Sequence, residues 1–151
     1  MSHSCRKGFS MIELLVVIAV IGIMALIAIP WWLTYLPTAT VNAAAREVQG
    51  GLNQARLLAI TTRQNICVQV LPNGFRLRQN GCAGALWFGA DTDPTGLFRP
   101  SNALGNTVTL AGAGPTFTQF GTANQVVIIR VTGRGRTQTV TVQLTGRVTI
   151  P

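Results

Sequence analysis

The chain has 151 residues, 48% of them hydrophobic, and a formal net charge of +8 from twelve basic and four acidic residues. This length suffices for one ordinary domain, and since the first third is strongly apolar, about a hundred residues remain for a globular head. The basic excess favours anionic partners, although it equally fits a plain solubilising surface. The single histidine, His3, and the scarcity of acids provide no acid–base pair, so the composition argues against an enzyme.

Residues 9–29 form a continuous apolar block with one charged residue, Glu13. A helix of this length can cross a hydrocarbon layer of about 30 Å, at about 1.5 Å per residue. Arg6 and Lys7 precede the block and no comparable charge follows closely, which predicts a cytoplasmic amino terminus and an exported head.

Three aromatic residues follow the block, where an interfacial belt is expected: Trp31, Trp32 and Tyr35. A cleaved secretory signal is the alternative. The apolar run is longer than a usual signal core, however, and no A-x-A cleavage site follows it. We therefore predict a retained single-pass transmembrane segment at 9–36.

Glu13 lies inside the apolar run, only about one helical turn from its start. A carboxylate within a membrane costs several kcal/mol unless a partner compensates it, so such a residue suggests a function. The alternative is that the Glu13 side chain reaches back to the lipid headgroups.

The segment Lys7-Gly8-Phe9-Ser10-Met11-Ile12-Glu13-Leu14-Leu15 resembles the prepilin processing site of type IV pilins and type II secretion pseudopilins. The resemblance implies a leader peptide at 1–8, cleavage after Gly8 by a prepilin peptidase, and methylation of the new amine of Phe9. It also implies that Glu13 pairs with the amino terminus of a neighbouring subunit during assembly. Desolvated together, an amine and a carboxylate attract more strongly than in water.

Gly22 and Pro30 predict a break in the helix, because proline lacks a backbone donor and clashes with the preceding turn. We expect a bend or local melting between them. Alternatively, Pro30 ends the helix at the membrane surface.

The globular head is predicted to span 37–151 and to begin with an amphipathic helix at 38–61. A narrow stripe of small apolar residues recurs there at alternating spacings of four and three: Val41, Ala45, Val48, Leu52, Ala55 and Ala59. Such a stripe suits close packing on a sheet. Gly50-Gly51 either permits close backbone approach or weakens the helix.

Short strands follow. The alternation from Ile66 to Leu71, the turn Pro72-Asn73-Gly74 and the run 75–79 predict a hairpin, whereas 80–105 lacks periodicity. Further strands are expected at 107–111, 115–120, 125–132, 137–144 and 147–150. The predicted fold class is therefore α+β, with a long spine helix on one small antiparallel sheet.

Cys67 and Cys82 are the cysteines of the predicted head, since Cys5 lies in the leader. An even pair in an exported domain favours one disulfide. Two buried free thiols are the alternative, because the spacing fits neither a redox CxxC site nor a zinc knuckle.

From Ala43 onward the layout resembles the GspH/FimT group of minor pilins and pseudopilins, and it therefore implies a type IV pilin-like fold. The matching pieces are Leu52-x-x-Ala55-Arg56-x-x-Ala59, Arg63, the Cys67 and Cys82 pair, Trp87-x-Gly89-x-Asp91 and Thr145-Gly146-Arg147-Val148.

Members of the FimT branch bind DNA through a Gly-Arg-x-Arg motif near the carboxy terminus. Gly133-Arg134-Gly135-Arg136 has this pattern in the penultimate hairpin, whereas Gly146-Arg147-Val148-Thr149 in the last strand has Thr149 in place of the second arginine. The candidate phosphate-binding residues for double-stranded DNA are Arg130, Arg134, Arg136 and Arg147. A polar turn that carries arginine is the alternative.

Asp91 to Gly96 resembles a calcium loop faintly but lacks further carboxylates, and it makes a good turn; we expect no metal and no cofactor. The sequence predicts a minor pilin or pseudopilin, anchored in inner-membrane lipid with its head in the periplasm or outside. Its expected partners are prepilin peptidase and other pilins. The alternative function is DNA binding for natural transformation.

Overall fold

The computed structural model describes residues 10–90, 92–100 and 108–151, and for residues 28–34 it describes the backbone alone. The chain divides into two units, residues 1–36 and 37–151. The helix α1 (Met11–Thr62) runs through this boundary. Ser10 precedes the helix, and its carbonyl oxygen accepts hydrogen bonds from the N–H groups of Glu13 (3.0 Å) and Leu14 (3.2 Å).

Within the first unit, every residue from 11 to 27 is exposed, although most of these side chains are large and apolar. This part of α1 therefore has no core of its own to face. Within the described ranges, no helix meets the length and apolarity expected of a membrane span. Residue 9 and the side chains of 28–34, which belong to the segment predicted to span, lie outside the described residues.

α1 is continuous through Gly22 and Pro30. The predictions that the helix melts between these residues, or ends at Pro30, are both wrong. One proline removes a single backbone donor, and the hydrogen bonds of the neighbouring turns suffice to keep the helix in register.

The carboxyl half of α1 buries the predicted stripe. Each of its members is no more than 2% exposed: Val41, Ala45, Val48, Leu52, Ala55 and Ala59. Ala44 and Gly51 are buried beside them. Gly51 permits close approach, because a methyl group there would overlap the ring of Phe75, whereas a methyl at Gly50 would meet nothing within 4 Å.

The head contains two four-stranded antiparallel sheets. The first, in the order β3-β2-β1-β5, consists of β1 (Ile66–Leu71), β2 (Gly74–Gln79), β3 (Leu97–Phe98) and β5 (Thr116–Phe117). The second, in the order β4-β6-β7-β8, consists of β4 (Thr109–Ala111), β6 (Val127–Gly133), β7 (Arg136–Val142) and β8 (Val148–Thr149).

The predicted hairpin is confirmed as β1 and β2, in a register that pairs Ile66 with Gln79 and Leu71 with Gly74. The prediction of a single sheet is wrong. The alternation of apolar and polar residues locates strands, but it does not say which strands pair. The strand β3 was missed because two residues carry no detectable period.

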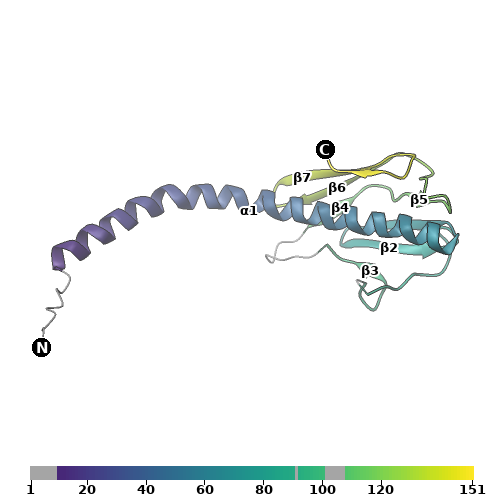
Figure 1. Cartoon of the computed structure of the whole chain (residues 1–151), viewed down its shortest axis with the longest axis horizontal. Helices are drawn as coiled ribbons and strands as arrows, with labels where there is room; N and C mark the ends of the chain where they lie inside the picture. The colour runs from purple at the N-terminus through teal and green to yellow at the C-terminus, as the bar shows by residue number, and fades with distance from the viewer. Residues whose placement is uncertain (1–9, 91, 101–107) are drawn as a thin grey trace, which may run out of the picture. The chain divides into compact units, whose positions relative to one another are not determined.

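The core of the head lies between α1 and both sheets. It joins Val48 and Leu52 of the helix to Leu77 and Phe117 of the first sheet and Val131 of the second. Figure 1 shows the carboxyl half of α1 between the β6–β7 pair and the β2–β3 pair. The small residues of the helix stripe allow this close packing.

Candidate functional site

The predicted processing residues, Gly8 and Phe9, lie outside the described residues. Glu13 lies in the first turn of α1, where a carboxylate interacts favourably with the positive end of the helix dipole. Its neighbours in the turn are exposed apolar side chains: Met11 is 83% exposed and Ile12 is 71% exposed. A single acid therefore stands on an otherwise apolar helix surface.

Cys67 and Cys82 form a disulfide that joins the first strand of the hairpin to the loop after its second strand. This is the pairing that the sequence favours. Cys67 is buried in β1, opposite Arg78 of β2. The bond therefore fastens the start of the loop 80–96 to the first sheet.

The Gly133-Arg134-Gly135-Arg136 motif forms the two-residue turn between β6 and β7, with Gly133 paired to Arg136. Arg134 (φ 46°) and Gly135 (φ 74°) both have left-handed backbone conformations. Positive φ at both central residues defines the type I′ turn, which matches the twist of a hairpin. Both arginines of this turn are exposed.

The structure does not bring the four candidate arginines into one site. Arg130 alternates with buried residues of β6 and projects from the outer face of the second sheet, whereas Arg136 is in register with the inward-facing positions. Arg147 lies past the other end of β7, where its backbone carbonyl accepts a hydrogen bond from the N–H of Gln143, roughly 20 Å of extended strand from Arg136. The four arginines therefore lie at separate places on the second sheet and its turns, and their part in binding DNA stays a prediction.

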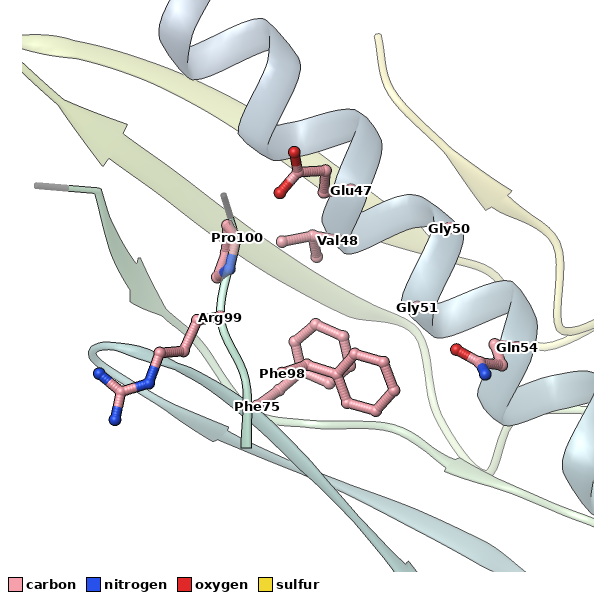
Figure 2. Close-up of a pocket in the computed structure, with 9 residues that line it drawn as sticks. All are labelled: Glu47, Val48, Gly50, Gly51, Gln54, Phe75, Phe98, Arg99 and Pro100. Atoms are coloured by element: carbon pink, nitrogen blue, oxygen red, sulfur yellow. The ribbon is translucent and has the colours of Figure 1, made fainter. Parts of the chain in front are cut away.

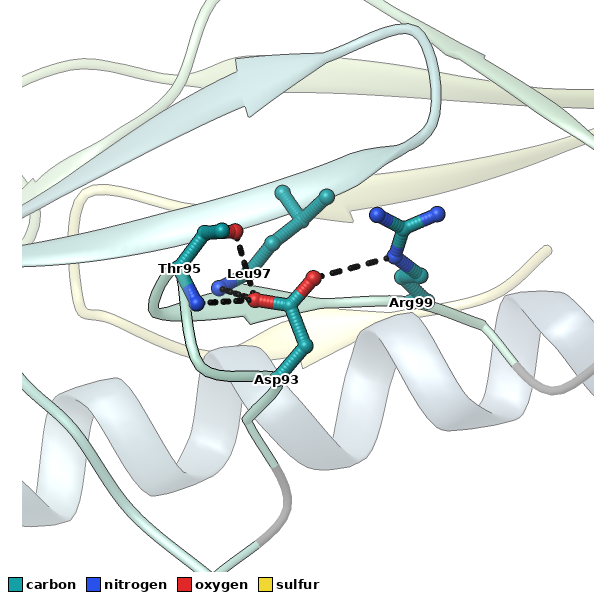
Figure 3. Close-up of polar contacts among 4 residues, drawn as sticks. All are labelled: Asp93, Thr95, Leu97 and Arg99. Atoms are coloured by element: carbon teal, nitrogen blue, oxygen red, sulfur yellow. Dashed lines mark hydrogen bonds and ion pairs between the residues drawn. The ribbon is translucent and has the colours of Figure 1, made fainter.

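The segment around Asp93 is organised by its own side chain (Figure 3). Asp93 Oδ1 accepts hydrogen bonds from the N–H groups of Thr95 (2.8 Å) and Leu97 (3.0 Å) and from the Thr95 hydroxyl (2.6 Å). Asp93 Oδ2 pairs with Arg99 Nε at 3.1 Å. These bonds, led by that of the Thr95 hydroxyl, hold the pKa of Asp93 far below its usual value.

These hydrogen bonds fold the loop into a turn, which is the alternative to a calcium site that the sequence predicts. Asp91 lies outside the described residues. Within the described ranges, no three His, Cys, Asp or Glu side chains gather in a group that could hold a metal ion.

A pocket of about 500 Å³ lies between α1 and the first sheet. Phe75 and Phe98 stack in it, with ring centroids 5.0 Å apart and planes 3° from parallel. Figure 2 shows these rings below the helix at Gly51, with the guanidinium of Arg99 directed away from them. The pocket was not predicted from the sequence, since it depends on β3 and on the absence of side chains at Gly50 and Gly51.

Arg56 belongs to the motif Leu52-x-x-Ala55-Arg56-x-x-Ala59, and its surroundings in the structure were not predicted from the sequence. Its Nε is buried, and within the part of the chain that the structure describes it has no hydrogen-bond partner. A Cβ built on Gly121 or Gly146 would lie 3.2 or 3.1 Å from this nitrogen. The guanidinium stem therefore passes between two glycine turns, and the sequence carries no periodic signal for such a placement.

Two solved structures share this fold. The type IV minor pilin FimU of Pseudomonas aeruginosa is 20% identical, with a TM-score of 0.56, over 74% of this chain and 87% of that chain. The minor pseudopilin EpsH from the type 2 secretion system of Vibrio cholerae is 12% identical, with a TM-score of 0.54, over 74% of this chain and 95% of that chain.

Residues 3–29 match the prokaryotic N-terminal methylation motif. The chain thus combines this motif with a pilin-like fold. A fimbrial protein of Pseudomonas aeruginosa is 40% identical over 67 residues, which are 44% of this chain and 43% of the relative. A type IV major fimbrial protein FimA of Dichelobacter nodosus is 46% identical over 44 residues, which are 29% of this chain and 28% of the relative.

The matched segments thus span less than half the length of these relatives. The α+β pilin-like fold predicted from the sequence is confirmed.

Proposed function

We propose that the chain is a minor pilin or pseudopilin, a structural subunit of a type IV pilus or type II secretion pseudopilus, acting in its tip or initiation complex. The observation that carries this proposal is the methylation motif at 3–29, which contains the exposed apolar part of α1, in a chain whose head has the fold of FimU and EpsH. Such a helix needs lipid or neighbouring helices to cover it.

In this proposal a prepilin peptidase removes residues 1–8 and methylates Phe9. An intact-mass measurement on protein from native membranes tests the step. We expect a mass lower by residues 1–8 and higher by one methyl group. A full-length mass would contradict the proposal, and a Gly8→Leu variant, which blocks the cleavage position, serves as the unprocessed control.

Before assembly, the segment 9–36 spans the inner membrane once, with the head in the periplasm or outside. The basic residues Arg6 and Lys7 favour a cytoplasmic amino terminus. The exposed apolar side chains from 11 to 27 support a lipid environment, because contact between that apolar surface and water is unfavourable. The disulfide supports an oxidising compartment for the head.

Glu13 pairs with the amino terminus of a neighbouring subunit in the assembled fibre. We expect Glu13→Ala to lower the amount of this chain in fibres at least ten-fold, since breaking a buried ion pair costs about 3–5 kcal/mol. Quantitative immunoblotting of purified fibres measures the effect. Ser10→Ala, in the same turn, is the matched control. Equal incorporation of Glu13→Ala and wild type would remove this role for Glu13.

A second candidate function is binding of double-stranded DNA at the β6–β7 turn. It is favoured by the exposure of Arg134 and Arg136 on a rigid type I′ turn. Arginine contacts to phosphates neutralise charge without reading the bases. Each contact therefore contributes about one unit to the slope of log affinity against log salt concentration.

Retardation of a DNA duplex by the full chain in detergent tests this candidate. We expect Arg136→Ala to weaken retardation several-fold at low salt and to lower the salt slope by about one. Arg46→Ala removes one exposed charge from α1 and is the matched control. If both variants bind alike, the turn is not the DNA site.

A further inference from the structure

The carboxyl end of α1 is enclosed by two turns of the head. The N–H of Gly121 donates to the carbonyl of Thr118 at 2.8 Å, and the N–H of Gly146 donates to the carbonyl of Gln143 at 2.8 Å. The two turns touch, since a methyl group on Gly146 would overlap the carbonyl oxygen of Gly121. They hold a fixed surface around the last two turns of the helix.

A cationic side chain lies at the centre of this surface. Arg56 Nε is buried beside the two turns and has no hydrogen-bond partner among the described residues. The Arg56 side chain as a whole is only partly buried, so a carboxylate brought by a partner can meet its charged group from outside. Arg147, the residue after Gly146, is exposed and adds a second positive charge.

Exposed apolar side chains lie on the three segments that meet at Arg56. Phe120 is 78% exposed, Leu57 is 60% exposed and Leu144 is 55% exposed. Ile60, which is 43% exposed, lies against Gly121, and the carbonyl of Leu144 accepts the N–H of Ala123 at 2.9 Å, so the segments are neighbours. We name this surface the end patch: Arg56, Leu57, Ile60, Phe120, Leu144 and Arg147.

The composition of the end patch indicates the class of its partner. Aromatic and arginine side chains dominate the energetic centres of protein interfaces, whereas duplex DNA is held by phosphate charge and gains nothing from Phe120 or Ile60. None of the four acidic residues of the chain occurs in the segments 56–62, 118–123 or 143–147 that build the patch. The partner must therefore supply the carboxylate.

We propose that the end patch is the docking surface for an adjacent pilin-like subunit, whose Asp or Glu pairs with Arg56 while its apolar side chains cover Phe120. This inference rests on the proposed function, because it places the chain beside other subunits of a fibre. It adds the surface, the central residue and the chemistry of the neighbour.

The first test is photo-crosslinking in cells that assemble the fibre, with a photoreactive phenylalanine analogue in the full chain. One chain carries the analogue at Phe120, and the control carries it at Phe88, which is 59% exposed in the loop before β3. We expect position 120 alone to yield an adduct with a pilin-like subunit, located by mass spectrometry in a peptide that contains Asp or Glu. An adduct with DNA, or no adduct while the chain is in fibres, would overturn the inference.

The second test is a charge exchange. Phe120→Ser and Arg56→Gln should each lower incorporation roughly ten-fold, as truncation of interface centres does, whereas Arg130→Gln, on the outer face of β6, should not. Arg56→Glu should regain incorporation when the crosslinked carboxylate is changed to arginine.

If Phe120→Ser and wild type enter fibres equally, the end patch is not an interface although the proposed function stands. If wild type itself never enters fibres, the proposed function and the inference both fail.

Discussion

A comparison of two glycines with nearly the same backbone conformation separates the cost of backbone strain from the cost of steric crowding. Gly146 has φ 76° and Gly135 has φ 74°, but a methyl group would overlap the Gly121 carbonyl at the first and meet nothing within 4 Å at the second. Any difference between alanine variants at these two positions therefore reports the steric contact.

We expect Gly135→Ala to destabilise the chain by about 1 kcal/mol, the cost of a left-handed conformation for an L-residue. Gly146→Ala should cost about 2–4 kcal/mol, because overpacking adds to that strain. Thermal unfolding of both variants in the same mild detergent measures the difference. Equal losses would show that the turns at 118–121 and 143–146 move apart freely.

The second residue-scale prediction concerns Asp93, whose pKa is depressed by the hydrogen bonds of its own loop. A carboxylate with a depressed pKa in the folded state stabilises the fold above its unfolded pKa, and this contribution is lost as the pH falls. We expect Asp93→Asn to lower the melting temperature at pH 7, and the gap to wild type to narrow below about pH 4. A gap that stays constant down to pH 2 would contradict this reading. Thr92→Ser, which retains its hydroxyl, is a control in the same loop.

At the scale of elements, two adjacent glycines in the carboxyl half of α1 have contrasting surroundings. Gly50 is open and Gly51 is in contact with Phe75. Gly50→Ala should raise the free energy of unfolding by about 0.5–1 kcal/mol, since alanine favours helix. Gly51→Ala should lower it by about 1–3 kcal/mol through overpacking. Chemical denaturation compares the two, and a stabilising Gly51→Ala would show that the Phe75 ring yields.

The disulfide closes a loop with a sequence separation of 15 residues around the β1–β2 hairpin. We expect its reduction to lower the free energy of unfolding by about 3 kcal/mol. The measurement compares oxidised and reduced protein carrying Cys5→Ser, so that Cys67 and Cys82 are the only cysteines. A Cys67→Ser/Cys82→Ser variant should match the reduced form. No change on reduction would mean that the hairpin and its loop are already fixed by packing.

Elements with a local signal were predictable, and pairings over long distances were not. The stripe from Val41 to Ala59 was recognisable because helix period and burial coincide. The division into two sheets was not, since it depends on β5 joining β1 and β4 joining β6 across long separations. The setting of Arg56 between Gly121 and Gly146 likewise depends on three distant segments, so no spacing in the sequence reveals it.

At the scale of the whole molecule, the head has its own core, whose members all lie after residue 40. We expect a fragment of residues 37–151 to fold as a soluble monomer with a melting temperature within a few degrees of the full chain, because the described members of the core all lie within this fragment. Circular dichroism and light scattering test this. An unfolded or aggregated fragment, with the full chain folded in detergent, would show that the head needs residues 10–36.

In the proposed fibre, the exposed surface of α1 from 11 to 27, which is apolar apart from Glu13, bears on the energetics of polymerisation. Hydrocarbon tails and the flanks of similar helices solvate such a surface about equally well, so transfer from bilayer to fibre releases little hydrophobic free energy. The equilibrium between stored and polymerised subunits is then governed by sparse polar contacts and by work from the assembly machinery. A filament built in this way can be drawn back into the bilayer and reused without a large thermodynamic penalty.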